Sequence, residues 1–219
     1  MKIAVRGGHC PKVPGARALL DELTEDRLVK DVVINYLRQL GCDVLDVTPP
    51  DITPTSSYDL SYGVNKANLW KADLFVSIHF NKCYDDYNGV LGSEVCVYNN
   101  FDEANRVCNK LAELGFKNRG QKIRTNLYEL KHTHMKAMII EVCFVEATED
   151  VKLYKKLGYD KVGKAIVEGI LNTKIEEDKT ENTNTLYRVV SGSYKSKENA
   201  EKQVKKLKEM GIDSFILTT

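Results

Sequence analysis

The sequence predicts an α/β fold: a mainly parallel, twisted sheet flanked by helices, followed by a small C-terminal βαβ module. Short apolar segments typical of strands alternate with longer amphipathic segments typical of helices, which is the order of a largely parallel sheet. The apolar runs at 74–78 and 138–140 show no polar alternation, as expected of strands covered on both faces. A polar stretch without periodicity at 173–185 predicts a linker before the last module.

The expected elements follow from hydrophobic periodicity and from turn residues. Strand-like segments are 2–7, 42–48, 73–80, 92–98 and 136–145, and helix-like segments are 24–41, 61–72, 102–116 and 159–172. Thr24 is the expected N-cap of the first helix. Glu25 and Asp26 then fall in its first turn, where acidic side chains favour the helix dipole. Gly41 is expected to end this helix.

Composition limits the classes of partner that the protein is expected to bind. The 32 basic and 31 acidic residues nearly cancel, which argues mildly against a nucleic-acid function. No apolar run reaches the length of a membrane helix, and the N-terminus lacks the apolar centre of a secretory signal. The six cysteines form no CxxC pair, so we expect reduced, mostly structural thiols; Cys10, next to His9, is the one that could neighbour a metal.

Polar side chains stand at the ends of three predicted strands: His9, His79 and Glu141. In open α/β sheets, ligands bind beyond the carboxyl ends of the strands. Acidic residues at 22, 25 and 26 open the first long helix on the same side of the sheet, so histidines and carboxylates can converge in one cleft. Two imidazoles and one carboxylate form a common catalytic zinc set, and a further carboxylate can serve as general base in hydrolysing an amide.

Each of these residues also has a structural interpretation. Either histidine alone could be a hydrogen-bonded core residue, and Glu141 could be a buried acid paired with a base. The ligand spacings are long and no compact HExxH motif is present, so the pattern alone leaves both interpretations open.

A resemblance goes further than the separate residues. The segments "GGHC…PGA…TEDRLVKDVV", "ANLWKADLFVSIHFN", "GSEVCVY" and "LYELKHTHMKAMIIEVCFVEATEDVKLY" occur in the order found in one enzyme family. Together they resemble the zinc-dependent N-acetylmuramoyl-L-alanine amidases of the amidase-3 type, over residues 2 to 172. The similarity is greatest to the catalytic domains of endolysins from clostridial phages.

This resemblance implies zinc as the cofactor and names its ligands. The metal ligands are expected to be His9, Glu25 and His79, where Glu25 is taken as the glutamate that opens the first helix, and Glu141 is expected to be catalytic. Glu22 lies one helical turn before Glu25 and could replace it as the ligand. The first motif also departs from the family, because Cys10 stands where many relatives have glycine.

Asn81 and Arg124 are candidates for substrate binding. Asn81 points the same way as His79 along its strand, so it is either a substrate contact or a strand-end cap. Arg124, before "LYEL", is a weaker substrate candidate, with a solvated charge as the alternative. His132 and His134 are expected in a loop near the cleft, without binding zinc.

The tail resembles the first half of a SPOR domain, a module that binds peptidoglycan. The expected domains are a catalytic domain at 1–172, the linker at 173–185 and the half module at 186–219, in which Ser196 caps a helix. A complete SPOR domain has two such halves, so we expect a homodimer formed through this module, with a truncated remnant as the alternative.

The resemblance implies a peptidoglycan hydrolase that cleaves the amide between N-acetylmuramic acid and the L-alanine of the stem peptide. Its expected partner is bacterial peptidoglycan, with no nucleic acid and no membrane insertion. The alternatives are a non-catalytic peptidoglycan-binding protein on the same fold and a zinc-dependent carbohydrate deacetylase. Without a signal peptide, the protein is expected to be made in the cytoplasm and to reach the wall after holin-mediated or lytic release.

Overall fold

The computed structural model describes residues 1–52, 55–176, 192–212, 214 and 216 of the chain. The chain divides into two compact units, Met1–Ile175 and Glu176–Thr219, here called the N-terminal and C-terminal units. Each unit is described by itself. The greater part of the linker predicted at 173–185 lies outside the described residues.

The N-terminal unit contains a six-stranded sheet in the order β2-β1-β3-β6-β4-β5. Its strands are β1 (Lys2–Gly7), β2 (Asp43–Asp46), β3 (Leu74–Asn81), β4 (Ser93–Val97), β5 (Asn118–Ile123) and β6 (Lys136–Phe144). Strands β2, β1, β3 and β6 pair in parallel, as do β4 and β5, whereas β4 meets β6 antiparallel. The predicted α/β class with a mainly parallel sheet is therefore confirmed.

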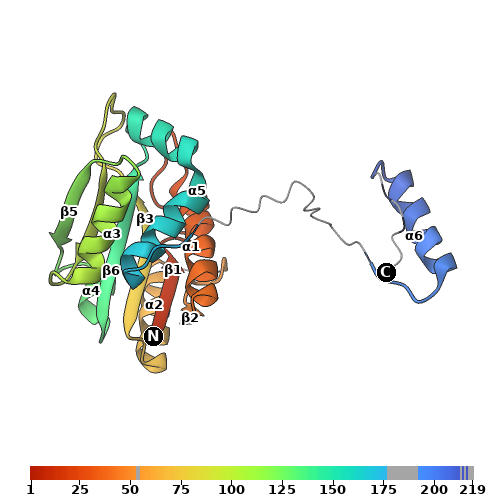
Figure 1. The fold of residues 1–219 in the computed structure, drawn as a ribbon, viewed down its shortest axis with the longest axis horizontal. Helices are drawn as coiled ribbons and strands as arrows, with labels where there is room; N and C mark the ends of the chain where they lie inside the picture. Colours follow the sequence, from red (N-terminus) through yellow and green to blue (C-terminus); the bar gives the residue numbers. More distant parts are fainter. Residues whose placement is uncertain (53–54, 177–191, 213, 215, 217–219) are drawn as a thin grey trace. The chain divides into compact units, whose positions relative to one another are not determined.

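Helices cover both faces of the sheet (Figure 1). On one face lie α1 (Glu22–Gln39), α3 (Asp102–Glu113) and α5 (Thr148–Leu171), whose apolar sides pack with Ile3, Val76 and Ile140 into the larger core. On the other face, α2 (Ser56–Trp70) and the short α4 (Tyr128–His132) pack on a smaller cluster that includes Phe75 and Ile139. The all-apolar runs noted in the sequence are thus strands buried from both sides.

The first helix begins three residues earlier than the sequence suggested. Asp21, not Thr24, is the N-cap: its side chain accepts a hydrogen bond from the Thr24 N–H at 3.1 Å, and the helix starts at Glu22. Both residues are good N-caps, and periodicity does not choose between them. The correction moves Glu22 into the position that opens the helix.

Other boundaries also differ from prediction. Strand β5 was not predicted, because its sequence, NRGQKI, is polar and carries a glycine with positive φ. Helix α5 begins at Thr148 rather than at 159, and it contains a kink at Gly158, where φ is 77°. All six cysteines are free, as expected.

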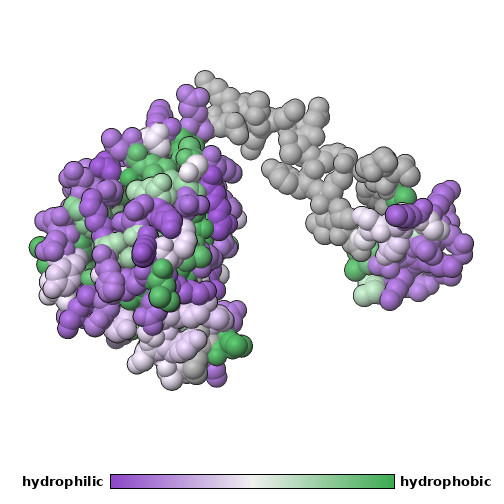
Figure 2. Space-filling model, turned by 90° about the horizontal axis from the view of Figure 1, so that it is seen from below, coloured by the Kyte–Doolittle hydropathy of each residue, from purple (hydrophilic) through white to green (hydrophobic). Residues whose placement is uncertain are grey.

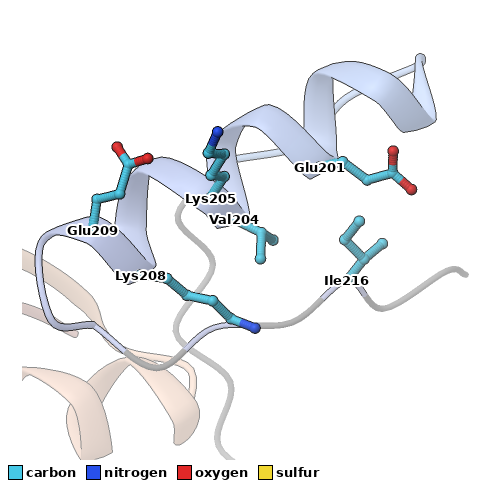
Figure 3. A pocket seen from close by; sticks show the side chains of 6 residues that line it. All are labelled: Glu201, Val204, Lys205, Lys208, Glu209 and Ile216. Carbon is cyan, nitrogen blue, oxygen red and sulfur yellow. The ribbon is translucent and has the colours of Figure 1, made fainter.

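In the C-terminal unit, α6 (Lys197–Glu209) follows Ser196, the residue predicted as its cap. Val204 on this helix and Ile216 face one another across an open hollow that Glu201 and Lys208 flank (Figure 3). The strand predicted to precede this helix lies outside the described residues, as does most of the strand predicted at the end of the chain.

The helices and the surface can be compared with what a membrane or a partner would require. Among the described residues, no helix combines the length and apolar character needed to cross a bilayer. The face of the N-terminal unit shown in Figure 2 is mostly hydrophilic, with separate hydrophobic patches. Such isolated exposed apolar residues, of which Leu69 is one, are ordinary in globular proteins.

Candidate metal centre

Glu22 lies between the two predicted histidines. Its Oε1 is 3.0 Å from His9 Nε2 and 3.1 Å from His79 Nδ1. The same oxygen accepts the backbone N–H of Phe80 at 3.0 Å, while Oε2 accepts that of Ala16 at 2.6 Å. These bonds fix the carboxylate, which is almost fully buried. One helix start and two strand ends therefore meet at a single point.

The main chain of His9 is held by helix α1. Its N–H donates to Asp26 Oδ2 at 3.0 Å, and its carbonyl accepts from Arg27 Nη2 at 2.8 Å. The ring Nδ1 lies 2.9 Å from the carbonyl oxygen of Val13, which leaves Nε2 facing Glu22. A backbone carbonyl on the far ring nitrogen is the arrangement that orients histidines as metal ligands.

Two glycines make room for the histidines. A side chain at Gly8 would place its Cβ about 2.1 Å from the His79 ring, and one at Gly15 would lie 2.4 Å from Glu22 Oε2. Gly15 also has a φ of +72°, which L side chains rarely adopt. The "GGH" and "PGA" motifs of the sequence therefore allow the turn after β1 to approach β3 and α1 closely.

The close contact of Glu22 with His9 and His79 shifts the pKa values of Glu22 and His79. Burial disfavours the charged form of Glu22, but His79 and His9 outweigh it and hold the pKa of Glu22 well below its usual range. Burial lowers the pKa of His79, yet Glu22, Glu141 and Glu129 together raise it to about 9.

The three residues fit a divalent metal. One nitrogen of each histidine and one oxygen of Glu22 all lie within 4.8 Å of one another. Two imidazoles and a carboxylate are the donor set of many catalytic zinc sites, which keep a fourth position open. We refer to this group as the His9–Glu22–His79 cluster.

Glu25, the ligand expected from the sequence, does not join this cluster. Its Oε2 accepts a hydrogen bond from the Tyr154 hydroxyl at 2.7 Å, on the side of α1 that packs against α5. Burial and Glu25 both raise the pKa of Tyr154, so that phenol stays a donor. The geometry therefore favours Glu22, the alternative noted in the sequence, over Glu25 as the carboxylate of the cluster, because the helix begins three residues earlier than expected.

Glu141 stands beside the cluster, as expected. It is directly opposite His79 in the register of β3 and β6. Its Oε2 is buried without a hydrogen-bond partner among the described residues, which is costly for an acid unless another ligand arrives. Burial raises the pKa of Glu141 to about 7, and Glu22 and Glu94 add to this rise while His79 and His9 oppose it.

Asn81 is tied to a buried acid that the sequence analysis missed. Its Nδ2 donates to Glu94 Oε1 at 3.2 Å, and its Oδ1 accepts the N–H of Lys82 at 2.8 Å. Glu94 also pairs with Arg119 at 2.5 Å and lies opposite Glu141 in the register of β4 and β6. The antiparallel pairing that places Glu94 here could not be derived from a pattern that predicted parallel strands.

Arg124 follows β5 and is exposed, and its backbone N–H donates to the carbonyl of Val97 at 2.9 Å. Burial raises the pKa of the Cys96 thiol to about 12; Glu141 and Glu94 add to this rise and Arg124 opposes it. Arg124 makes no hydrogen bond or ion pair to the His9–Glu22–His79 cluster within the described part of the chain.

His132 and His134 hydrogen-bond to Asn68 on α2, and neither belongs to the His9–Glu22–His79 cluster. The His132 carbonyl accepts from Asn68 Nδ2, and the His134 N–H donates to Asn68 Oδ1, both at 2.9 Å. His132 is the last residue of α4 rather than a loop residue, and His134 lies between α4 and the start of β6 at Lys136.

Arg27 escaped the sequence analysis as part of the site. Asp26 belongs to the acidic group expected at the start of the first helix, and it shares the face of Glu22 on α1 because it lies four residues later. Burial raises the pKa of Asp26 to about 7, against the opposing effects of His79, His9 and Arg27.

Comparisons with known proteins place the N-terminal unit in a family. Residues 3–172 match the family described as N-acetylmuramoyl-L-alanine amidase, and residues 153–218 match the SPOR domain. An uncharacterized protein of Clostridium perfringens (strain 13 / Type A) is 45% identical over 183 residues, which are 81% of this chain and 54% of that protein. The chain thus spans about half the length of the first curated relatives it matches.

Two further relatives carry names. The N-acetylmuramoyl-L-alanine amidase CwlM of Bacillus licheniformis is 26% identical over 99% of this chain and 85% of its own length. The solved catalytic domain of the CD27L endolysin targeting Clostridia difficile is 32% identical, with a TM-score of 0.73, over 80% of this chain and 99% of that one. With the family matched over most of its length, this chain belongs to the N-acetylmuramoyl-L-alanine amidases.

Proposed function

We propose that this protein is a zinc-dependent peptidoglycan hydrolase, which cleaves the amide between N-acetylmuramic acid and the L-alanine of the stem peptide. The observation that carries the proposal is the convergence of His9, Glu22 and His79 beside Glu141, whose buried oxygen has no partner among the described residues. Family membership and the amidase and endolysin names of its relatives support the same reaction.

In this proposal His9, Glu22 and His79 hold the metal. Bound zinc supplies a Lewis acid and a water of lowered pKa. Glu141 would act as general base in the attack of water on the amide carbonyl and as general acid toward the leaving amine of L-alanine. The role fits the position of Glu141, which is buried opposite His79 and has one oxygen without a partner among the described residues.

The decisive experiment separates amide cleavage from other wall chemistry. Purified cell walls are incubated with the protein, with and without a chelator, and new L-alanine N-termini, reducing sugar ends and free acetate are measured. Metal-dependent release of L-alanine N-termini is the expected result. Acetate release alone would indicate a deacetylase, and binding to walls without any product would indicate a non-catalytic protein.

The Glu141→Gln variant tests the division of roles. Its amide keeps the size of the side chain but cannot accept the proton, so zinc binding is expected to persist while turnover falls by about 10² to 10⁴-fold. Loss of both properties together would assign Glu141 to the metal rather than to the proton transfer.

The C-terminal unit is proposed to bind peptidoglycan, as its SPOR match supports. The test uses the Glu141→Gln chain, which keeps the substrate intact, and compares its retention on sedimented walls with that of the same variant ended after Ile175. The longer chain is expected to be retained more strongly. Sedimentation velocity of the intact chain tests the proposed homodimer, which predicts about twice the chain mass of 24.8 kDa.

A further inference from the structure

A fully buried arginine lies directly behind the turn that carries His9. Arg6, on β1, donates from Nη2 to the carbonyl of Gly8 at 2.7 Å and from Nε to that of Gly7 at 3.0 Å. A buried guanidinium requires anionic partners. Here two acids supply them: Nη2 is 2.8 Å from Asp59 Oδ2, and Nη1 is 2.8 Å from Glu129 Oε1.

The two acids differ in what else they reach. Asp59, on α2, has no hydrogen bond or ion pair to either histidine among the described residues. The second oxygen of Glu129, on α4, lies 4.0 Å from His79 Nε2, the ring nitrogen that does not face Glu22. Both acids are almost fully buried, so neither is simply a solvated charge.

Both ring nitrogens of His79 have polar neighbours. Nδ1 faces Glu22 at 3.1 Å, whereas Nε2 faces the Ser77 hydroxyl at 3.1 Å and the Glu129 carboxylate beyond it. An N–H on Nε2 can donate toward these oxygens, and Nδ1 then has its lone pair free. Partners of this kind fix the tautomer and orientation of metal-ligating histidines.

We infer that Glu129 is a positioning residue: held by Arg6, it acts with Ser77 to keep the Nε2 proton of His79 in place, so that Nδ1 is the nitrogen presented to the metal. Arg6 couples this to the other histidine, because the same guanidinium holds the two carbonyls that precede His9. The ion-paired group of Arg6, Asp59 and Glu129 thereby orients the imidazoles of both His9 and His79.

This inference rests on the proposed zinc site but not on the proposed reaction, so its test measures zinc binding. Zinc affinity of the full chain is determined by competition with a chromophoric chelator for the original protein, for Glu129→Gln and for Asp59→Asn. Removing an outer partner of a metal-bound histidine typically costs about 10 to 100-fold in affinity. We expect a loss of at least about tenfold in Glu129→Gln.

Asp59→Asn is the matched control, because it removes an equally buried partner of the same guanidinium. It is expected to lower the thermal stability while leaving zinc affinity within about threefold, less than the range for a lost outer partner. Equal losses in both variants, or wild-type affinity in Glu129→Gln, would overturn the inference. An original protein that binds no zinc would instead refute the proposed metal site.

A measurement without substitutions guards against a variant that fails to fold. In the zinc-loaded chain, long-range ¹H–¹⁵N correlation of the histidine side chains reports which ring nitrogen of His79 carries its proton. The proton is expected on Nε2. A zinc-loaded His79 protonated on Nδ1 would refute the inference directly.

Discussion

Glu22→Gln and Glu25→Gln form a matched pair, since both residues lie on one turn of α1 and only the first is between the histidines. Apparent zinc-binding free energies of structural sites are about 10–16 kcal/mol. If each of three ligands supplies about a third, losing one costs at least about 3 kcal/mol, or about 100-fold in affinity.

That loss converts into a thermal shift. With zinc at about 100 times the dissociation constant, the original protein gains about 2.7 kcal/mol, and a variant that binds 100-fold more weakly gains only about 0.4 kcal/mol. At about 2–4 °C per kcal/mol for a unit of this size, zinc should raise the Tm of the original protein by about 5–11 °C and that of Glu22→Gln by about 1–2 °C.

The assay is a thermal melt of each variant with zinc and with chelator, so each protein is compared only with itself. This removes the cost that Glu22→Gln incurs without metal, where the bonds to Phe80 and Ala16 are disturbed. Glu25→Gln can still accept from Tyr154, so its zinc shift should equal that of the original protein. The reasoning fails if Glu25→Gln loses the shift and Glu22→Gln keeps it.

Further predictions concern space, packing and charge. Gly8→Ala should lose the zinc-dependent thermal shift, because its Cβ would lie about 2.1 Å from the His79 ring; an unchanged shift would contradict this geometry. Ile166→Ala, in the larger core, should cost about 2–5 kcal/mol in chemical denaturation, against within about 0.5 kcal/mol for the exposed Leu69→Ala. Burial raises the pKa of Asp46, but Thr48 and Lys30 outweigh this effect, and the pKa in the folded protein is lowered. The Asp46 carboxylate therefore stabilises the fold fully above its unfolded pKa of about 3.9, and this contribution disappears as the pH falls through the lower folded pKa. The difference in unfolding free energy between the original protein and Asp46→Asn should therefore shrink below about pH 4, and a constant difference would show that the carboxylate is not stabilised.

Much of the N-terminal unit could be predicted because its signals are local. Strand β3 is apolar from Leu74 to Ile78 apart from Ser77, and a short run of this kind is typical of a strand buried on both faces. The positions of His9, His79 and Glu141 then follow from the rule that parallel strands end at one edge of a sheet. This is why residues far apart in the chain could be assigned to one site.

The remainder depends on contacts that no local pattern records. Glu22 and Glu25 are both acids in a first turn, and only the competition between Asp21 and Thr24 for the cap decides which one opens the helix. Glu129 lies on a five-residue helix, which is too short to show hydrophobic periodicity. Arg6 is indistinguishable in the sequence from an exposed strand residue, because its acidic partners Asp59 and Glu129 are far away in the chain. The roles of Glu129 and Arg6 can be recognised only in the folded structure, where α2 and α4 lie together against the sheet.

The charges of the site indicate which protons a bound cation would displace. Glu22, Asp26 and Glu141 are crowded at one end of the sheet, and raised pKa values near 7 for Asp26 and Glu141 and near 9 for His79 show that the site holds protons where charges are otherwise uncompensated. A dication can take their place. Since His79 must give up a proton to bind metal, zinc affinity should rise with pH below about 9 by up to about tenfold per unit, with proton release on binding. Calorimetric titrations in buffers of different ionisation enthalpy measure that release, and an affinity that stays flat from about pH 6 to 8 would mean that the site is already deprotonated when the metal arrives.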